Sequence, residues 1–170
     1  MSKLILGIDP GVTGAFALID AASGAYVHVN DMPVVSDQSL SWVDGAELQT
    51  LLLSSINGRP AIAVIERVSA MPQQGVSSTF KFGVAVGSIL GTVQTLRIPL
   101  HLIHSSQWKR ALGLTFEKDV KQAERKRASL DKARLLFPTA PLDRQKDNGR
   151  AEALLIAHWY LQNRVGAKAA

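Results

Sequence analysis

Residues 3–11 read Lys-Leu-Ile-Leu-Gly-Ile-Asp-Pro-Gly, and this stretch decides the predicted fold. Lys3–Ile8 is short, apolar and rich in branched side chains, and the Asp-Pro-Gly after it is typical of a turn, so we expect a buried strand that ends at Asp9. Ala15–Asp20 and Tyr26–Asn30 follow after short turns. The three segments together predict an antiparallel meander.

The remainder of the chain alternates strand and helix patterns around polar turns. We expect a polar loop over Ser36–Ser41, strands over Pro60–Glu66 and Ile98–Ile103, and helices over Asp44–Ser54, Phe80–Leu96, Ser106–Leu112, Ala123–Phe137 and Arg150–Asn163. Because helices separate the later strands, those strands are expected to be parallel. The predicted fold class is α/β, with a mixed five-stranded sheet (three antiparallel strands, then parallel strands) flanked by helices.

Length and composition limit the classes of protein that fit. The chain has 170 residues, and we expect a single domain over residues 1–165 with a disordered tail at 166–170. The absence of cysteine excludes disulfides, Cys-ligated zinc, iron–sulfur clusters and thiol catalysis. Continuous apolar runs are far shorter than the roughly 20 residues that cross a bilayer, so we expect a soluble, cytoplasmic protein without a membrane partner.

Positive charge is concentrated in one region. The net charge is +5, yet residues 1–96 hold 4 Lys/Arg against 7 Asp/Glu, whereas residues 97–150 hold 13 against 6. Such a region either binds a polyanion such as nucleic acid or is the solvated face of a helix, and charge counting leaves both interpretations open.

Two carboxylates follow two apolar strands. Asp9 and Glu66 both stand at the carboxyl end of a predicted strand, so parallel neighbouring strands would place them at one sheet edge, where open α/β sheets bind ligands. Unpaired buried carboxylates are costly, and an oxygen-only ligand set suits Mg²⁺ or Mn²⁺. The alternative is structural: Asp9 caps its turn, and Glu66 pairs with a surface cation such as Arg67.

A third acidic group lies near the C-terminus. Glu152 precedes an apolar helical run, and Asn148 lies one helical turn before it on the same face, where it offers a neutral oxygen as a weaker ligand. Asp147 can join them only if it lies in the lead-in to the helix or at its N-cap. The alternative for Asp147 is a plain N-cap without a metal.

The motifs Ile-Leu-Gly-Ile-Asp-Pro-Gly-Val-Thr-Gly, Ala-Ile-Ala-Val-Ile-Glu and Arg-Ala-Glu-Ala-Leu-Leu-Ile-Ala resemble those of RuvC-type Holliday junction resolvases of the ribonuclease H-like superfamily. The resemblance spans nearly the whole chain. It implies that Asp9, Glu66 and Glu152 are metal ligands. The family's remaining ligand falls three or four residues before the last acid, where this chain has Gly149 and Asn148, so Asp147 is the nearest candidate.

The same resemblance implies a crossover junction endodeoxyribonuclease, bacterial or phage-encoded, that acts in DNA recombination and repair. We expect a homodimer that binds a four-way junction and makes paired symmetric nicks. Two Mg²⁺ ions per site (Mn²⁺ as a substitute), about 4 Å apart, would activate water and stabilise the leaving oxygen. The sequence does not reveal a cut-site preference or a helicase partner.

The resemblance also implies DNA contacts. An aromatic wedge at the branch point is expected in Gln73–Phe82, with Phe80 or Phe82 as the ring and Lys81 between them, although Phe82 fits a core position equally well. Lys109 and Lys126 are expected near the scissile phosphate. Further backbone contacts are expected from Lys118, Lys121, Arg125 and Arg127. Trp108 and Trp159 are interpreted as core residues, and His101, His104 and His158 as structural or surface residues.

Three other functions deserve comparison. The Asp-Pro-Gly-Val-Thr-Gly loop also resembles that of actin-like sugar kinases, but those need two such domains and this chain is too short. A ribonuclease H-like nuclease on another structured or RNA–DNA substrate stays open. So does a catalytically weakened junction-binding module, because Asn148 stands where the family has a stronger ligand.

Overall fold

The computed structural model describes residues 2–37, 40–69 and 75–165. Its elements, in chain order, are β1 (Leu4–Asp9), β2 (Ala15–Asp20), β3 (Tyr26–Asp31), β4 (Val34–Ser36), β5 (Ser41–Val43), α1 (Gly45–Ile56), β6 (Ala61–Glu66), α2 (Val76–Thr95), β7 (Leu100–Ile103), α3 (Ser105–Ala111), α4 (Gln122–Leu136), α5 (Asn148–Tyr160) and a π-helical turn, Leu161–Val165. The predicted tail and residues 73–74 of the predicted wedge segment lie outside the described residues.

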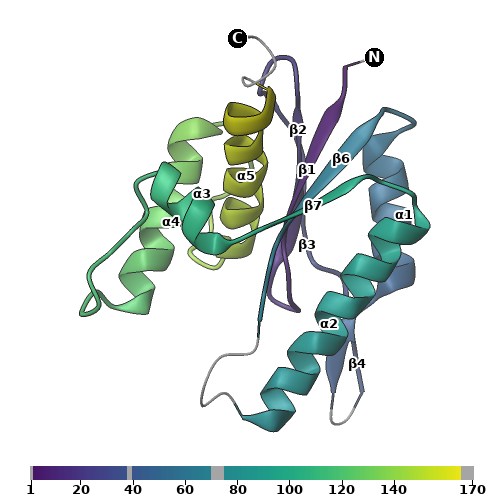
Figure 1. Ribbon diagram of the computed structural model, residues 1–170, viewed down its shortest axis with the longest axis horizontal. Coiled ribbons are helices and arrows are strands. Elements are labelled where there is room, and N and C mark those ends of the chain that lie inside the picture. The colour runs from purple at the N-terminus through teal and green to yellow at the C-terminus, as the bar shows by residue number, and fades with distance from the viewer. Residues whose placement is uncertain (1, 38–39, 70–74, 166–170) are drawn as a thin grey trace.

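The main sheet has five strands in the order β3-β2-β1-β6-β7 (Figure 1). β1 pairs with β2 antiparallel and with β6 parallel, and β7 extends the parallel section beyond β6. The predicted mixed sheet of three antiparallel strands followed by parallel strands is therefore confirmed.

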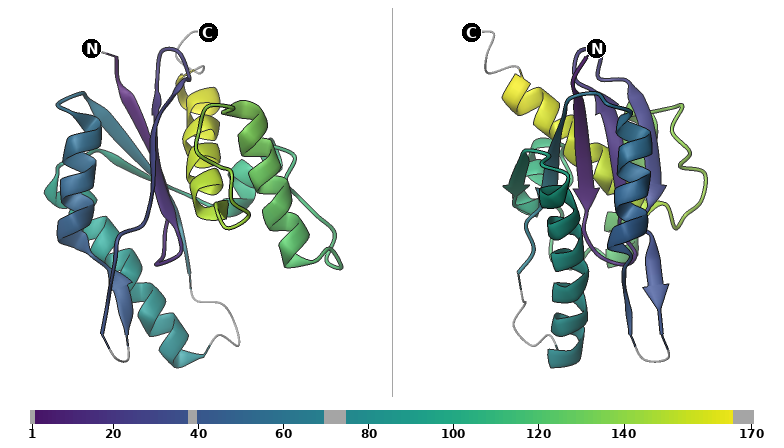
Figure 2. Two further views of the ribbon diagram at one scale, coloured as in Figure 1. Left: turned by 180° about the vertical axis from the view of Figure 1, so that it is seen from behind. Right: turned by 90° about the vertical axis from the view of Figure 1, so that its right-hand side faces the viewer.

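Helices cover both faces of this sheet (Figure 2). Alternate side chains of each strand point to opposite faces, so Leu4, Leu6 and Ile8 of β1 pack into one core with α1 and α2. Ile5 packs into a second core with α3, α4 and α5. The same alternation puts Asp9 and Glu66 on the α5 face, because each continues the series of alternate residues that faces α5.

Gly7 allows α5 to lie directly against β1. A Cβ atom at residue 7 would lie only 2.1 Å from the Ala153 carbonyl oxygen and 2.8 Å from the Ala157 amide nitrogen. Any side chain larger than hydrogen would therefore push the helix away from the strand. This close approach brings the first turn of α5, with Glu152, to the end of β1, with Asp9.

One predicted loop is partly wrong. Ser36 and Ser41, expected in a polar loop, instead pair as the ends of the small β4–β5 hairpin, and their hydroxyl oxygens lie 2.7 Å apart. The polar composition of this segment hid the strands because both are three residues long and the first is exposed. The expected helices are all present, with ends shifted by a few residues.

Helix α2 is long and apolar enough to cross a membrane by length and composition alone, and 22% of its apolar window is buried. The sequence analysis predicted this helix but compared only continuous apolar runs with the bilayer thickness, and Ser, Thr, Gly and Lys81 interrupt the apolar residues here. A core helix of a soluble protein passes the same test, so this is weak evidence for a membrane span. The exposed side chains on this helix include Val76 and Phe80, with 87% and 64% of their surface accessible.

Candidate active site

The carboxyl ends of β1 and β6 and the first turn of α5 meet at one edge of the sheet. Ile8 and Ile65 are paired in the parallel register, so Asp9 and Glu66, the next residues, lie side by side on adjacent strands. Asp9 and Glu152 line a cavity of about 970 Å³ between β1, α3, α4 and α5. Asp9 therefore has Glu66 beside it on the neighbouring strand and shares the cavity with Glu152.

The three carboxylates influence one another electrostatically. Burial, followed by the charges of Glu152 and Glu66, raises the pKa of Asp9 well above its usual range, while Lys109 and Lys126 lower it by less. Burial also raises the pKa of Glu66, against a hydrogen bond from Trp108. A cation brought among these groups would relieve the repulsion.

Lysines border the carboxylates. Lys109 Nζ lies 3.3 Å from Glu152 Oε2, and Ser129 Oγ donates to Glu152 Oε1 at 3.4 Å. Lys126 is exposed on α4 at the rim of the same cavity. Both lysines predicted to lie near a scissile phosphate therefore stand beside the acidic groups.

Asn148 lines this cavity and has a side-chain oxygen without a partner among the described residues. Its Nδ2 donates to the Gln145 carbonyl at 2.9 Å, whereas its buried Oδ1 has no hydrogen-bond partner. An amide oxygen left without a donor is available to a cation or a water molecule. The predicted weaker ligand thus lies in the cavity with Asp9 and Glu152.

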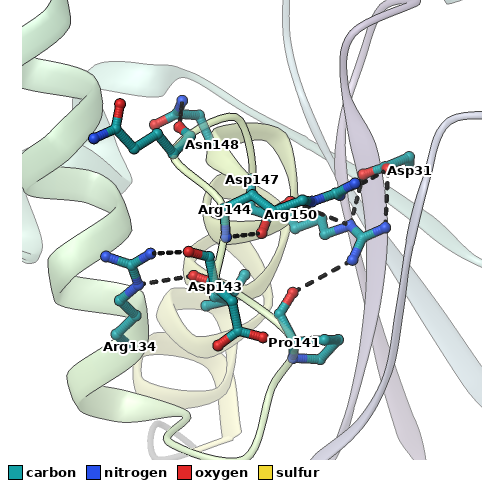
Figure 3. A network of polar contacts seen from close by, with 10 residues as sticks. Asp31, Arg134, Pro141, Asp143, Arg144, Asp147, Asn148 and Arg150 are labelled. Carbon is teal, nitrogen blue, oxygen red and sulfur yellow. Dashed lines mark hydrogen bonds and ion pairs between the residues drawn. The ribbon is translucent and has the colours of Figure 1, made fainter.

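Asp147 occupies the N-cap position of α5, and its carboxylate is paired with arginine (Figure 3). Its carboxylate accepts hydrogen bonds from the backbone N–H of Arg144 at 2.8 Å and from Arg144 Nε at 2.7 Å. The side chain is almost fully buried, with 1% exposed. Helix α5 begins only at Asn148, and Asp147 makes no side-chain cap hydrogen bond to it, because its oxygens turn back toward Arg144.

Two arginines link this aspartate to the end of β3. Arg150 binds Asp31 through two hydrogen bonds of 2.6 and 2.8 Å, and Arg144 lies 3.2 Å from the same carboxylate. These hydrogen bonds lower the pKa of Asp31, first through Arg150. For Asp147, burial alone would raise the pKa, but the hydrogen bonds from Arg144 have the larger combined effect. The pKa of Asp147 is therefore lowered, like that of Asp31. We call Asp31, Arg144, Asp147 and Arg150 the arginine-paired network.

Gly149, at the other family ligand position, has no room for a side chain. A Cβ atom there would lie 2.8 Å from the Thr13 carbonyl oxygen and about as close to the backbone of Gly14. A ligating residue at 149 would therefore require the β1–β2 turn to move. This packing leaves Asn148 as the polar side chain that α5 adds to the cavity beside Glu152.

The predicted DNA-contact residues differ in their surroundings. Phe80 is exposed, whereas Phe82 is half-buried, with ring atoms 3.4 Å from where a Cβ of residue 11 would stand. Arg125 donates to the carbonyl oxygens of Val120 and Glu117, so it holds the loop before α4. The remaining predicted contacts, Lys81, Lys118, Lys121 and Arg127, are exposed.

Sequence reasoning missed two side chains of this region. Trp108 is fully buried in the core, as predicted, but its Nε1–H also donates to Glu66 Oε2 at 2.9 Å. Phe116, which is 36% exposed, lines the cavity from the loop before α4. Helical spacing predicts burial of Trp108 but cannot indicate the direction of the indole N–H, and nothing in the sequence distinguishes Phe116 from a loop residue.

In the part of the chain that the structure describes, no three His, Cys, Asp or Glu side chains are arranged closely enough to hold one metal ion together. Lys109 draws the Glu152 carboxylate toward itself, so a shared site requires this ion pair to open. The donor chemistry nevertheless fits a hard divalent cation, because three repelling carboxylates and an unpaired amide oxygen lie in one region.

Solved structures show the same architecture. No protein-family model matches the sequence, and no curated protein matches it. The RuvC of Thermus thermophilus in complex with a Holliday junction substrate matches with a TM-score of 0.63 at 20% identity, over 96% of each chain. The chain has the RuvC fold. A second Thermus thermophilus RuvC structure matches at a TM-score of 0.54 and 19% identity, over 96% of both chains.

The yeast mitochondrial Holliday junction resolvase Ydc2 also matches, at a TM-score of 0.51 and 13% identity, over 99% of this chain and 81% of that one. These likenesses show that the chain shares the fold of these resolvase structures, as the RuvC-type resemblance predicted. The RuvC fold of this chain therefore carries acidic side chains at its strand edge, basic side chains around them and an arginine-paired network to one side.

Proposed function

We propose that this chain is a RuvC-type resolvase, a Mg²⁺-dependent endonuclease that cuts four-way DNA junctions by paired symmetric nicks. The observation that carries the proposal is the meeting of Asp9, Glu66 and Glu152 beside a lysine-bordered cavity on a RuvC fold. Two of the solved structures with this fold are a RuvC bound to a Holliday junction substrate and a Holliday junction resolvase.

The acids are assigned as metal ligands. Asp9, whose pKa is raised by the charges of Glu152 and Glu66, would hold a divalent cation together with these two carboxylates, and Asn148 Oδ1 would be a weaker ligand. Two bound divalent ions supply Lewis-acid activation of water and charge compensation for the phosphate. Asp147 is left out of this ligand set because Arg144 holds it.

The lysines are assigned to the DNA. Lys109, which pairs with Glu152 and lines the cavity, would contact the scissile phosphate through its ammonium. Lys126 at the cavity rim contacts the adjoining backbone, as do the exposed cations of α4 and the loop before it. Contacts of this kind fix the position of DNA without reading its sequence.

The assembly is proposed to be a homodimer, since two symmetric nicks need two sites. Its support lies on α2, where Gly83, Gly87 and Gly91 have open space at their Cβ positions and where Val76 is exposed. We assign Phe80 as the aromatic that stacks on a base at the branch point, because Phe82 is half-buried. Base–aromatic stacking contributes about 1–3 kcal/mol per base.

A junction-binding module with little nuclease activity is the second candidate. The Lys109–Glu152 ion pair and the pairing of Asp147 with Arg144 both favour it, because each removes a carboxylate from a metal site. In that case the basic surface would bind branched DNA, and the acidic groups would not cut it.

One experiment tests the proposal against two alternatives, a nuclease that acts on RNA–DNA hybrids and a junction-binding module without nuclease activity. The protein is incubated with a labelled four-way junction, a linear duplex and an RNA–DNA hybrid, with Mg²⁺ or with EDTA. We expect paired nicks in the junction alone, only with Mg²⁺, leaving 5′-phosphate and 3′-hydroxyl ends. Cleavage of the hybrid alone would contradict junction resolution, and tight junction binding without cuts would favour the module.

A further inference from the structure

The indole of Trp108 connects helix α3 to a carboxylate of the site. Trp108 Nε1 donates to Glu66 Oε2 at 2.9 Å, from a side chain with 0% of its surface exposed. Hydrogen bonds to ionised acceptors are roughly twice as strong as bonds between neutral groups. The bond restrains the rotation of the Glu66 carboxylate, which otherwise projects from the free end of β6.

The next residue on α3 reaches the opposite carboxylate. Lys109 Nζ lies 3.3 Å from Glu152 Oε2 and 4.9 Å from the centroid of the Trp108 ring. An ammonium at this distance from an indole face gains a cation–π attraction. Two consecutive residues of one short helix therefore touch Glu66 of β6 and Glu152 of α5.

Packing alone does not account for the choice of tryptophan. Trp108 belongs to the core cluster beneath α4 and α5, where an apolar ring is sufficient to fill space. An indole placed in a core needs an acceptor for its N–H, and here that acceptor is a carboxylate of the candidate active site. A phenylalanine would supply a similar ring and leave Glu66 without this donor.

We propose that Trp108 is a positioning residue for the carboxylate site: its N–H holds Glu66 in the orientation that binds a divalent cation. The proposal rests on the metal-binding part of the proposed function and not on the DNA substrate. It assigns to a core residue a role in the site that its burial alone does not indicate.

The first test measures cation binding without DNA. Mn²⁺ affinity is determined by isothermal titration calorimetry for the wild-type protein, Trp108→Phe and the matched control Trp159→Phe, with circular dichroism to confirm folding. Loss of a residue that orients a metal ligand typically weakens affinity about 10–100-fold, and we expect a loss in this range for Trp108→Phe alone. Wild-type affinity in a folded Trp108→Phe protein would overturn the proposal.

The outcome for the wild-type protein separates the two hypotheses. If the wild type binds Mn²⁺ and Trp108→Phe binds it equally well, only the role of Trp108 fails. If the wild type itself binds no Mn²⁺, the metal-dependent function fails and the role of Trp108 fails with it.

A second test works even if Trp108→Phe does not fold. Indole N–H resonances of ¹⁵N-tryptophan-labelled protein are recorded for the wild type and for Glu66→Gln, and assigned with Trp42→Phe and Trp159→Phe. We expect the Trp108 resonance to shift on Glu66→Gln and on addition of Mg²⁺, while the Trp42 and Trp159 resonances stay in place. A Trp108 resonance that is insensitive to both changes would overturn the proposal.

Discussion

Two sets of acidic side chains lie at the same end of this sheet, and they have opposite surroundings. Asp31 and Asp147 are bound by Arg144 and Arg150, and their pKa values are lowered. Asp9 and Glu66 face other carboxylates, and their pKa values are raised. A carboxylate paired with arginine stabilises the folded state. A carboxylate beside other carboxylates is repelled by them, and binding of a cation would relieve this repulsion.

Neutralising Asp9 is expected to produce the largest effect. Asp9→Asn should lower junction cleavage by about 10²–10³-fold or more, because the central ligand is lost, while junction binding is retained. The same change should raise the melting temperature of the metal-free protein by about 2–4 °C, the shift that 1 kcal/mol gives in a domain of this size. Cleavage assays and calorimetry with EDTA test both effects. Near-normal cleavage would contradict the assignment.

Neutralising Asp147 should instead lower the stability of the protein and leave cleavage almost unchanged. Asp147→Asn removes charge-assisted hydrogen bonds from Arg144 and should cost about 1.5–3 kcal/mol of unfolding free energy, measured by urea denaturation. The part-exposed Arg144 keeps the cost below that of a fully buried pair. Cleavage per folded molecule should change far less than for Asp9→Asn, because the Asp147 carboxylate is bound by Arg144 and not assigned to the cation. Loss of Mn²⁺ binding without loss of stability would make Asp147 a ligand after all.

The two sets should also respond oppositely to pH. Because the pKa values of Asp9 and Glu66 are raised in the folded state, the folded protein takes up protons first, and metal-free stability should rise as the pH falls from neutral through these pKa values. Because the pKa values of Asp31 and Asp147 are lowered, their contribution is present above the usual carboxyl range of about 4 and is lost below it.

Two partly buried histidines, His28 and His158, have lowered pKa values and oppose this rise, so the test compares each variant with the wild type in EDTA. Asp9→Asn should remove the stabilising contribution that appears as the pH falls from neutral, and Asp147→Asn should reduce the loss of unfolding free energy below about pH 4. An Asp9→Asn protein with the same pH dependence as the wild type would mean that the carboxylates of the candidate active site do not repel one another as described.

The smallest effect is expected from single cations around the site. Lys126→Ala should reduce the slope of log K against log salt for junction binding by about 0.9, the value for one phosphate contact, with no loss of stability. Arg125→Ala is the matched control on the same helix, since Arg125 binds the carbonyls of Glu117 and Val120. Fluorescence anisotropy titrations measure the slope, and an unchanged slope for Lys126→Ala would remove its phosphate contact.

Much of the fold follows from the sequence because the strands are apolar and bounded by turns. The end of β1 at Asp9 and of β6 at Glu66, together with the parallel pairing of these strands, predicted that the acids would meet. The β4–β5 hairpin could not be predicted, since exposed strands of three residues carry no periodicity. The sequence pattern also did not give the exact first residue of α5, and the position of that residue decides where the Asp147 side chain points.

Pairing between distant side chains was the least predictable part of the site. Arg144 and Arg150 reach Asp31 across 113 and 119 residues of chain, and no local spacing indicates such contacts. The hydrogen bond from Trp108 to Glu66 spans 42 residues in the same way. The contact between Gly149 and the β1–β2 turn likewise depends on tertiary packing. This contact excludes a side chain at residue 149 and leaves Asn148 as the candidate ligand beside Glu152.

A crystal structure of the protein soaked in Mn²⁺, with anomalous data collected at the manganese edge, tests the central claim most directly. The account predicts anomalous density among Asp9, Glu66 and Glu152, with Lys109 moved away from Glu152 and Asp147 still bound to Arg144. An intact Lys109–Glu152 ion pair with no manganese beside Asp9, or manganese bound at Asp31 and Asp147 instead, would contradict it.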